Sequence, residues 1–290
     1  MSKNIAVIGA TGSLGKPVAI ALAASGFTVS ALVRDLDKAR AKLPAEINMI
    51  KGDIKNAADL LALMNGQDFL YINLNLKLDE KKNDWHAETD GLKTILAAAE
   101  KSKIKRIGFI SSIVMRYQGM NTFNWWVFDM KQEAIKLIKA SPLPYTIFYP
   151  STFMENFEGN YRRGNSILLA GESKHKMYFI AAADFGKQVA NSFERLRNEN
   201  KEYDIQGLEA FTADEASLEF IKHYKKATLK ISRAPLPLLR FIGKFVQRLN
   251  YAAHIIEAMN NYPEKFSAEN TWRELGKPEI TLKEFAENSK

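Results

Sequence analysis

Short apolar stretches alternate with longer amphipathic segments through the first half of the chain. Such stretches are typical of strands buried on both faces, whereas apolar residues at helical spacing predict helices. The predicted strands cover residues 5–8, 27–33, 47–50, 68–73, 106–112 and 145–150. The predicted helices cover residues 16–24, 37–43, 57–64, 85–102 and 125–140. This alternation predicts a doubly wound α/β fold, in which helices cover both faces of a parallel sheet.

The alternation stops after Pro150. Thr212 and Thr281 are each followed three residues later by a glutamate, the capping-box spacing that begins a helix. In this half we expect strands at 176–180 and 202–205, and helices at 184–197, 212–224, 236–249, 251–261 and from 281 onward. We therefore divide the chain into a sheet domain over 1–157, to which a strand near 202–206 returns, and a smaller, mostly helical C-terminal cap over 158–290.

A glycine-rich turn joins the first predicted strand to the first predicted helix. Its spacing is G-x-x-G-x-x-G over residues 9–15, and Pro17 fits the first helical turn. Glycines in a strand–turn–helix unit allow a tight turn, a close approach of backbone to a pyrophosphate, and close packing of the helix. The N–H groups at the helix N-terminus then face the anion. We predict a dinucleotide site with contacts from Gly9, Thr11, Gly12, Ser13, Leu14 and Gly15. The alternative is a turn that binds nothing.

The end of the second strand bears on which dinucleotide would bind. Arg34 and Asp35 lie about 20 residues past the glycines, where such folds meet the adenosine ribose. An acid there binds the 2′-hydroxyl of NAD, and an arginine accommodates the 2′-phosphate of NADP. Arg34 therefore favours NADP, with NAD possible. The alternative is that both residues are solvated turn residues.

Polar residues also follow the later strands. Ligands of open α/β sheets lie outside the carboxyl ends of the strands. Asp53 is therefore a candidate to accept a hydrogen bond from the adenine amino group, or equally a cap for the helix at 57–64. Residues 73–75 lie at the carboxyl end of the fourth strand, and Ser111 and Ser112 at the carboxyl end of the fifth.

Charge and composition narrow the classes of function. The chain has 290 residues and a formal net charge of +8, spread along its length. This favours anionic ligands and makes nucleic acid an unlikely partner. Cysteine is absent, which excludes disulfides and thiolate chemistry and fits a cytoplasmic location. We expect no transmembrane segment and, from the spacing of the four histidines, no metal site. Composition leaves the oligomeric state open.

Several motifs together resemble the NmrA-like family, a branch of the atypical short-chain dehydrogenases/reductases. The resemblance is strong in the N-terminal half and looser over 184–290. The motifs are residues 9–15, the turn at Arg34, Gly52-Asp53, Ser111-Ser112, Lys131-Gln132-Glu133 and Pro144–Phe157. It implies an NAD(P)-binding Rossmann fold. Members of the family include NAD(P)H-dependent quinone and triarylmethane-dye reductases, isoflavone-reductase-like enzymes, and redox sensors that bind NADP without turnover.

The resemblance also implies site residues. Lys131 matches the lysine of the Tyr-x-x-x-Lys motif, which holds the nicotinamide ribose, but Val127 stands at the tyrosine position. A valine cannot transfer a proton. Ser111, Ser112 and Tyr117 are hydroxyl donors near the expected site, and Ser111 and Tyr117 are the candidate proton relays. The expected cofactor contacts are Asp53, Ile54, Asn73, Leu74, Asn75, Ser111, Lys131, Tyr149, Pro150, Ser151 and Phe153, besides the glycine turn and Arg34.

Two functions follow from the missing tyrosine. One is an NADPH-dependent reductase of a quinone-like or conjugated aromatic substrate, which needs little proton transfer. Trp125, Trp126, Phe153 and Phe157 would form its flat apolar pocket, or else simply pack in the core. The other is a non-catalytic, NADP-binding redox sensor that acts through a regulatory protein partner.

The segment 236–249 carries basic residues at helical spacing. Arg240, Lys244 and Arg248 recur every four residues among apolar ones. Such a helix binds an anionic membrane or a partner, or forms a solvated basic stripe over a packed apolar face. We expect the last of these.

Overall fold

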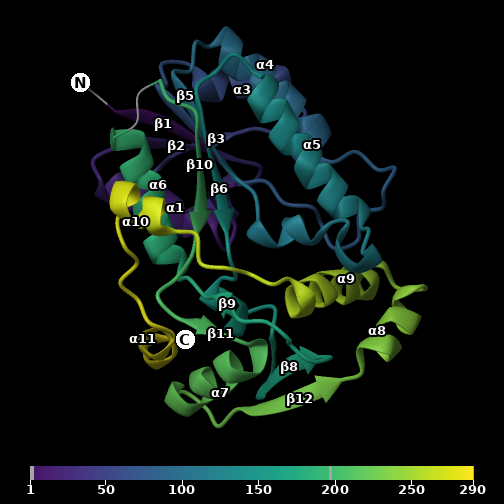
Figure 1. The fold of residues 1–290 in the computed structure, drawn as a ribbon. Coiled ribbons are helices and arrows are strands. Elements are labelled where there is room, and N and C mark those ends of the chain that lie inside the picture. Colours follow the sequence, from purple (N-terminus) through teal and green to yellow (C-terminus); the bar gives the residue numbers. More distant parts are fainter. Residues whose placement is uncertain (1–2, 196–197, 290) are drawn as a thin grey trace.

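A parallel sheet forms the centre of the protein. The computed structural model describes residues 3–195 and 198–289. In this part of the chain seven strands pair in the order β10-β6-β5-β4-β1-β2-β3 (Figure 1). They are β1 (Asn4–Ile8), β2 (Thr28–Val33), β3 (Asn48–Lys51), β4 (Phe69–Ile72), β5 (Arg106–Ile110), β6 (Tyr145–Pro150) and β10 (Lys201–Ile205). The order reverses at β1, which places a topological switch point between β1 and β4.

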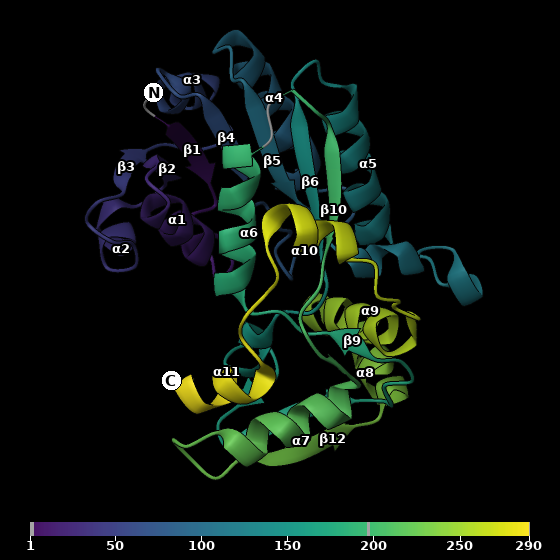
Figure 2. The ribbon, with the colours of Figure 1, turned by 60° about the vertical axis from the view of Figure 1, so that its left-hand side comes forward.

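Helices cover both faces of this sheet, so the chain has the predicted doubly wound, Rossmann-type fold (Figure 2). One face carries α1 (Gly15–Ala24), α6 (Ala182–Arg195) and α10 (Glu269–Leu275), and the other α3 (Ala57–Met64), α4 (Leu92–Lys101) and α5 (Trp126–Ala140). The short helix α2 (Leu36–Arg40) follows β2. Alternate residues of β1 enter two separate cores, with Ala6 and Ile8 on one side and Ile5 and Val7 on the other. This burial on both faces explains the continuous apolar stretch.

The helix predicted at 85–102 has an irregular first turn. Residues Ala87–Gly91 form a π-helical turn, and regular α-helix begins at Leu92. Gly91 fits there because a Cβ atom would lie 3.0 Å from the side chain of Ile54. The turn buries Glu88 at 1% exposure, directed toward α5.

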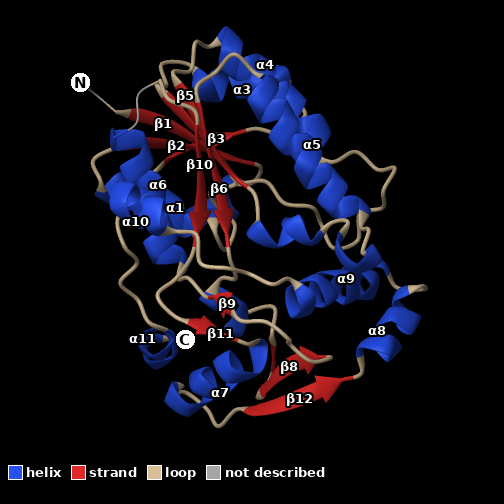
Figure 3. Cartoon of the chain, in the orientation of Figure 1, coloured by secondary structure: helices blue, strands red, loops and turns tan. Residues whose placement is uncertain are grey.

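The C-terminal cap contains small sheets as well as helices (Figure 3). β7 (Arg162–Arg163), β8 (Ser166–Ala170) and β12 (Lys230–Ala234) form one sheet, and β9 (Met177–Tyr178) pairs with β11 (Ala210–Phe211). The cap helices are α7 (Ala213–His223), α8 (Leu236–Gly243), α9 (Gln247–Asn261) and α11 (Leu282–Asn288). Single 3-10 turns occur at Ile113–Tyr117, Met120–Thr122 and Met154–Phe157.

Some predicted boundaries in the cap are confirmed and others are wrong. Both capping boxes form, at Thr212 and at Thr281. The predicted helix at 236–249 instead ends at Gly243, and α9 begins at Gln247. Gly243 permits this hairpin because its missing Cβ would lie 2.9 Å from the backbone of Asn250. The end of the predicted helix at 184–197 falls on residues 196–197, outside the described residues.

Candidate functional site

The glycine turn lies at the carboxyl end of β1, at the switch point of the sheet. Gly9 has a φ of 87°, and a Cβ atom there would collide with the backbone oxygen of Asn73. A Cβ atom at Gly15 would collide with the backbone oxygen of Gly9. The fold itself therefore requires glycine at both ends of the turn.

Gly12, in the middle of the turn, is different. It is exposed, and a Cβ atom there would have one close neighbour, the oxygen of Gly9 at 3.3 Å. The neighbouring N–H groups of Ser13 and Leu14 donate no hydrogen bond to any group within residues 3–195 and 198–289. Thr11 is half-buried beside them. The turn is thus an open cradle of donors at the N-terminus of α1, which fits the pyrophosphate of a dinucleotide.

At the end of β2 the two predicted residues differ in their surroundings. Asp35 caps α2, because its carboxylate accepts a 3.1 Å hydrogen bond from the N–H of Lys38. That hydrogen bond and the Lys38 ammonium lower the pKa of Asp35. Arg34 is exposed and forms no ion pair with any described residue. The guanidinium is therefore available to an anionic ligand.

Asp53 closes a turn after β3, since its carboxylate accepts a 2.9 Å hydrogen bond from the N–H of Lys55. The cap of α3 is Asn56, which accepts from Ala58 at 3.0 Å, so Asp53 is not the cap. Ile54, half-buried, packs against the apolar core.

The three residues after β4 divide between core and surface. The N–H of Asn73 donates to the oxygen of Ile8 at 3.0 Å, which ties this segment to β1. Leu74 is buried in the core and Asn75 is exposed. Asn73 and Asn75 therefore lie at the same edge of the sheet as the glycine turn.

Lys131 of α5 pairs with Glu88 of the π-helical turn. The Nζ–Oε1 distance is 2.9 Å, and the side chains are 13% and 2% exposed. Burial disfavours the ammonium, but the charge of Glu88 and its hydrogen bond to Lys131 outweigh burial and raise the pKa of Lys131. The second carboxylate oxygen of Glu88 is buried and has no hydrogen-bond partner among the described residues. The site thus holds a buried cation and an unsatisfied acceptor.

Tyr251 is a residue that the sequence analysis missed. It belongs to α9 of the cap, and its ring meets that of Trp125 edge to face at 4.9 Å. Its phenol interacts electrostatically with both Lys131 and Glu88, and burial raises its pKa. Tyr251 of the cap therefore lies within electrostatic range of Lys131, whereas Val127 is buried in the core. No local signal marks Tyr251, because the approach depends on how α9 packs.

The family assignment follows from a match over nearly the whole chain. The model of the NmrA-like family matches residues 1–286. This protein belongs to the NmrA-like family.

Individual relatives of this family member are distant. The chain is 23% identical to photosystem II assembly factor Ycf39 of Synechocystis sp. over 249 residues, 84% of this chain and 74% of that one. It is 23% identical to the NAD(P)H azoreductase of Xenophilus azovorans over 217 residues, 73% of this chain and 71% of that one. The NADPH-dependent quinone oxidoreductase QOR2 of Escherichia coli, solved with NADPH, superposes with a TM-score of 0.72 at 20% identity, covering 97% and 98% of the two chains. This last likeness shows the fold.

The two predicted proton relays of this NmrA-like protein are engaged away from Lys131. Ser111 is buried, and its hydroxyl donates to the sulfur of Met115 at 3.5 Å. Tyr117 is also buried, and its oxygen accepts a 3.4 Å hydrogen bond from Asn121. Neither hydroxyl bonds to Lys131.

The aromatic residues expected to form one flat pocket are separate. Trp125 packs against α9 in one core, while Phe157 stacks on Phe220 of the cap at 4.7 Å. Phe153 packs edge to face on Phe185 of α6 at 5.5 Å. Trp126 lies beside His86, at a ring distance of 5.3 Å. Core packing therefore accounts for Trp125, Phe153 and Phe157.

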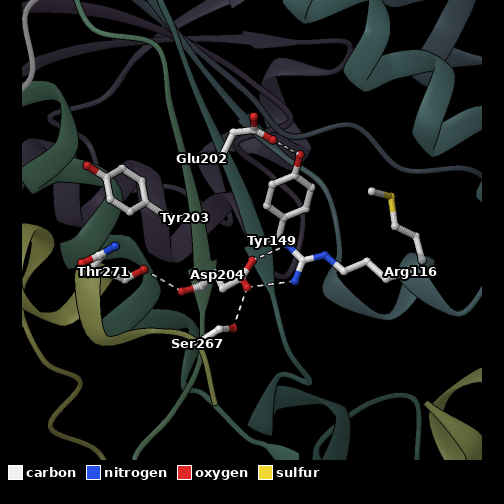
Figure 4. Close-up of a pocket in the computed structure, with 9 residues that line it drawn as sticks. Arg116, Tyr149, Glu202, Tyr203, Asp204, Ser267 and Thr271 are labelled. Atoms are coloured by element: carbon white, nitrogen blue, oxygen red, sulfur yellow. Dashed lines mark hydrogen bonds and ion pairs between the residues drawn. The ribbon is translucent and has the colours of Figure 1, made fainter. Parts of the chain in front are cut away.

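The end of β6 faces a hollow beside β10, away from the glycine turn (Figure 4). The hydroxyl of Tyr149 donates to Glu202 at 2.6 Å, and Arg116 lies over its ring. This hollow has a volume of about 380 Å³ and is lined by Met115, Arg116, Tyr149, Glu202, Tyr203, Asp204, Ser267, Asn270 and Thr271. Ser151 donates to half-buried Glu264 at 2.8 Å, and Pro150 pairs with Ile205. The side chains of Tyr149 and Ser151 thus bind other parts of the chain.

Neither a membrane span nor a metal site is found. Within residues 3–195 and 198–289, no helix combines the length and apolar character needed to cross a bilayer. The same residues contain no group of three or more side chains that would hold a metal ion.

Proposed function

We propose that this protein binds NADP(H) and reduces a quinone-like or conjugated aromatic acceptor. The observation that carries this proposal is the open cradle at Gly12, with the unpaired guanidinium of Arg34 at the end of the adjacent strand. Donors for a pyrophosphate and a cation for a 2′-phosphate then lie at one edge of the sheet. The names of two relatives, an azoreductase and a quinone oxidoreductase, support the choice of acceptor.

The residues around Lys131 would position the reacting end of the cofactor. When bound, the dinucleotide supplies a hydride. The ammonium of Lys131, oriented by Glu88, would donate hydrogen bonds to ribose hydroxyls. Tyr251 would then donate the proton to the acceptor oxygen, the role that Val127 cannot fill. The engagement of Ser111 and Tyr117 by other partners supports Tyr251 over both.

A spectrophotometric assay of NADPH oxidation with a panel of quinones and azo dyes, run beside a binding titration, tests this function. We expect NADPH to bind more tightly than NADH and to be oxidised when an acceptor is added. If the protein binds neither NADPH nor NADH, both parts of the proposal, cofactor binding and reduction, are contradicted.

The second candidate is a redox sensor that binds NADP without turnover and acts through a protein partner. Val127 at the position of the usual tyrosine favours it, and the name of the assembly factor Ycf39 supports a partner. This candidate predicts tight NADPH binding with no steady-state oxidation by any acceptor. For either function we propose a cytoplasmic location, consistent with the absence of cysteine.

A further inference from the structure

Helix α8 and the residues that connect it to α9 expose the apolar side that the sequence analysis expected to be packed. Phe245 is 79% exposed, Phe241 60% and Leu238 51%, and Ile242 and Val246 are also exposed. The buried residue of α8 is Gly243, where the helix meets α9. The expectation was wrong because α8 contacts the rest of the cap along a narrow, glycine-bearing edge.

The exposed residues of α8 and of its connection to α9 lie beside the segment after β4. The side-chain amide of Gln247 donates to the backbone oxygen of Glu80 at 2.8 Å, and Arg248 lies 3.8 Å from Asp79. These contacts hold a segment that carries Leu78, itself 46% exposed. We call Leu78, Leu238, Phe241, Ile242, Phe245 and Val246 the α8 patch. Clustered exposure of this kind marks an interaction surface.

Charged side chains of both signs border the α8 patch, and the basic ones outnumber the acidic ones. Lys244 is exposed and forms no ion pair with a described residue, and Arg248 is 70% exposed. The neighbouring segment adds exposed Lys77, Lys81 and Lys82, together with exposed Asp79 and Asp84. Arg240 is half-exposed and paired with Glu257. Aromatic and aliphatic side chains interleaved with lysine and arginine are complementary to the acyl boundary and acidic headgroups of a bilayer.

The position of α8 in the fold leaves the α8 patch accessible. Figure 1 shows α8 at the outer edge of the cap, on the side away from α1 and α6. We infer that the α8 patch docks on an anionic bilayer surface, with Phe241 and Phe245 entering the interface and Lys244 and Arg248 facing acidic headgroups. Docking of this kind needs no membrane-spanning helix and does not depend on the reductase activity.

Co-sedimentation of the full-length protein with vesicles tests this inference. Vesicles of equal parts phosphatidylcholine and phosphatidylglycerol should bind the protein, and vesicles of phosphatidylcholine alone should bind it much more weakly. Changing both Phe241→Ser and Phe245→Ser should weaken binding by more than tenfold, because two buried rings are lost. Leu218→Ser is the matched control, because Leu218 is 61% exposed on α7 and outside the patch. It should bind like the wild type.

A charge-reversed pair, Lys244→Glu with Arg248→Glu, gives a second measurement. It should remove the preference for phosphatidylglycerol, and added salt should weaken wild-type binding. Circular dichroism should match the wild type for every variant, because the changed side chains are exposed. Equal binding of the double Phe variant and the wild type would overturn the inference, as would no binding of the wild type to acidic vesicles. A patch-dependent dimer in ultracentrifugation without vesicle binding would overturn it too, because the occupant would then be a second copy.

Discussion

The three glycines of the turn after β1 are needed for different reasons. Gly9 and Gly15 are fixed by collisions with the protein's own backbone, whereas Gly12 borders open space. The turn can be predicted from the sequence because it depends on local strand–turn–helix geometry, whereas the binding role of Arg34 stays a prediction. The pairing of Lys131 with Glu88 and the approach of Tyr251 depend on long-range packing, which residue spacing does not encode.

We expect Gly12→Val to abolish NADPH binding without changing the fold. The side chain would occupy the cradle in front of α1, and lost hydrogen bonds to a charged group cost about 1.5–3 kcal/mol each. Calorimetric titration measures binding, and thermal unfolding measures the fold. Gly15→Val is the contrasting variant, which should unfold at a markedly lower temperature because of its collision with Gly9. Unchanged NADPH affinity in Gly12→Val would argue against the cradle.

Arg34→Ala should weaken NADPH binding by about 1.5–3 kcal/mol and NADH binding far less, because one charge-assisted contact to the 2′-phosphate is removed. Arg40→Ala is the matched control. Arg40 is also an exposed arginine, but it lies on α2 and is paired with Asp37. It should leave both affinities unchanged. Equal losses for the two cofactors in Arg34→Ala would show that Arg34 contacts another part of the dinucleotide.

Tyr251→Phe should lower kcat for quinone reduction at least tenfold while leaving the Kd of NADPH unchanged, because general acid catalysis typically contributes about a hundredfold or more. The loss should diminish at low pH, where solvent supplies the proton. Tyr117→Phe removes a hydroxyl that bonds to Asn121 and should keep near wild-type kcat. An unchanged kcat in Tyr251→Phe would remove the tyrosine from the mechanism.

Among the elements, the strands of the central sheet were the most predictable, because burial on both faces makes each one a continuous apolar stretch. The strands β7, β8 and β12 were missed, since they are short and mix polar with apolar residues. The π-helical turn before α4 was missed as well. The apolar residues of segment 85–102 recur at helical spacing, and a single π-helical turn hardly changes that spacing.

Glu88→Gln tests how the π-helical turn and α5 depend on each other. It should lower the free energy of unfolding by about 3 kcal/mol, because Lys131 would stay buried without its anionic partner. Adding Lys131→Met should recover part of that loss, since the remaining pair is neutral. Urea unfolding of the single and double variants gives the coupling energy. Strictly additive losses would mean that the ion pair contributes nothing to stability.

At the scale of the whole molecule, the chain passes several times between the sheet domain and the cap. After β6 the chain enters the cap, returns through α6 and β10, and re-enters the cap at β11. Glu155 lies at the first crossing, where its carboxylate accepts a 2.8 Å hydrogen bond from the N–H of Ala182 at the start of α6. Burial raises the pKa of Glu155 from its ordinary 4.5 to about 7, helped by the negative charges of Glu158 and Asp184.

This raised pKa makes stability depend on pH. Between about pH 4.5 and pH 7 the folded state holds a proton that the unfolded state has released, so stability should fall as pH rises and then level off. The total loss is about 3 kcal/mol. Glu155→Gln keeps the acceptor oxygen and should flatten this dependence, with higher stability than the wild type at pH 8. Urea unfolding across the pH range measures it, and parallel curves for the two proteins would exclude Glu155 as the cause.

The late position of β10 has a consequence during synthesis. When residue 157 leaves the ribosome, β6 is still a bare edge and nothing yet covers the face of the sheet beneath α6. On that face Phe193 lies so close to β5 that a Cβ atom at Gly108 would be 2.8 Å from its ring. The nascent sheet stays open until residues 182–205 emerge from the exit tunnel. A translational pause within residues 158–181 would leave this apolar face exposed to chaperones and to other nascent chains.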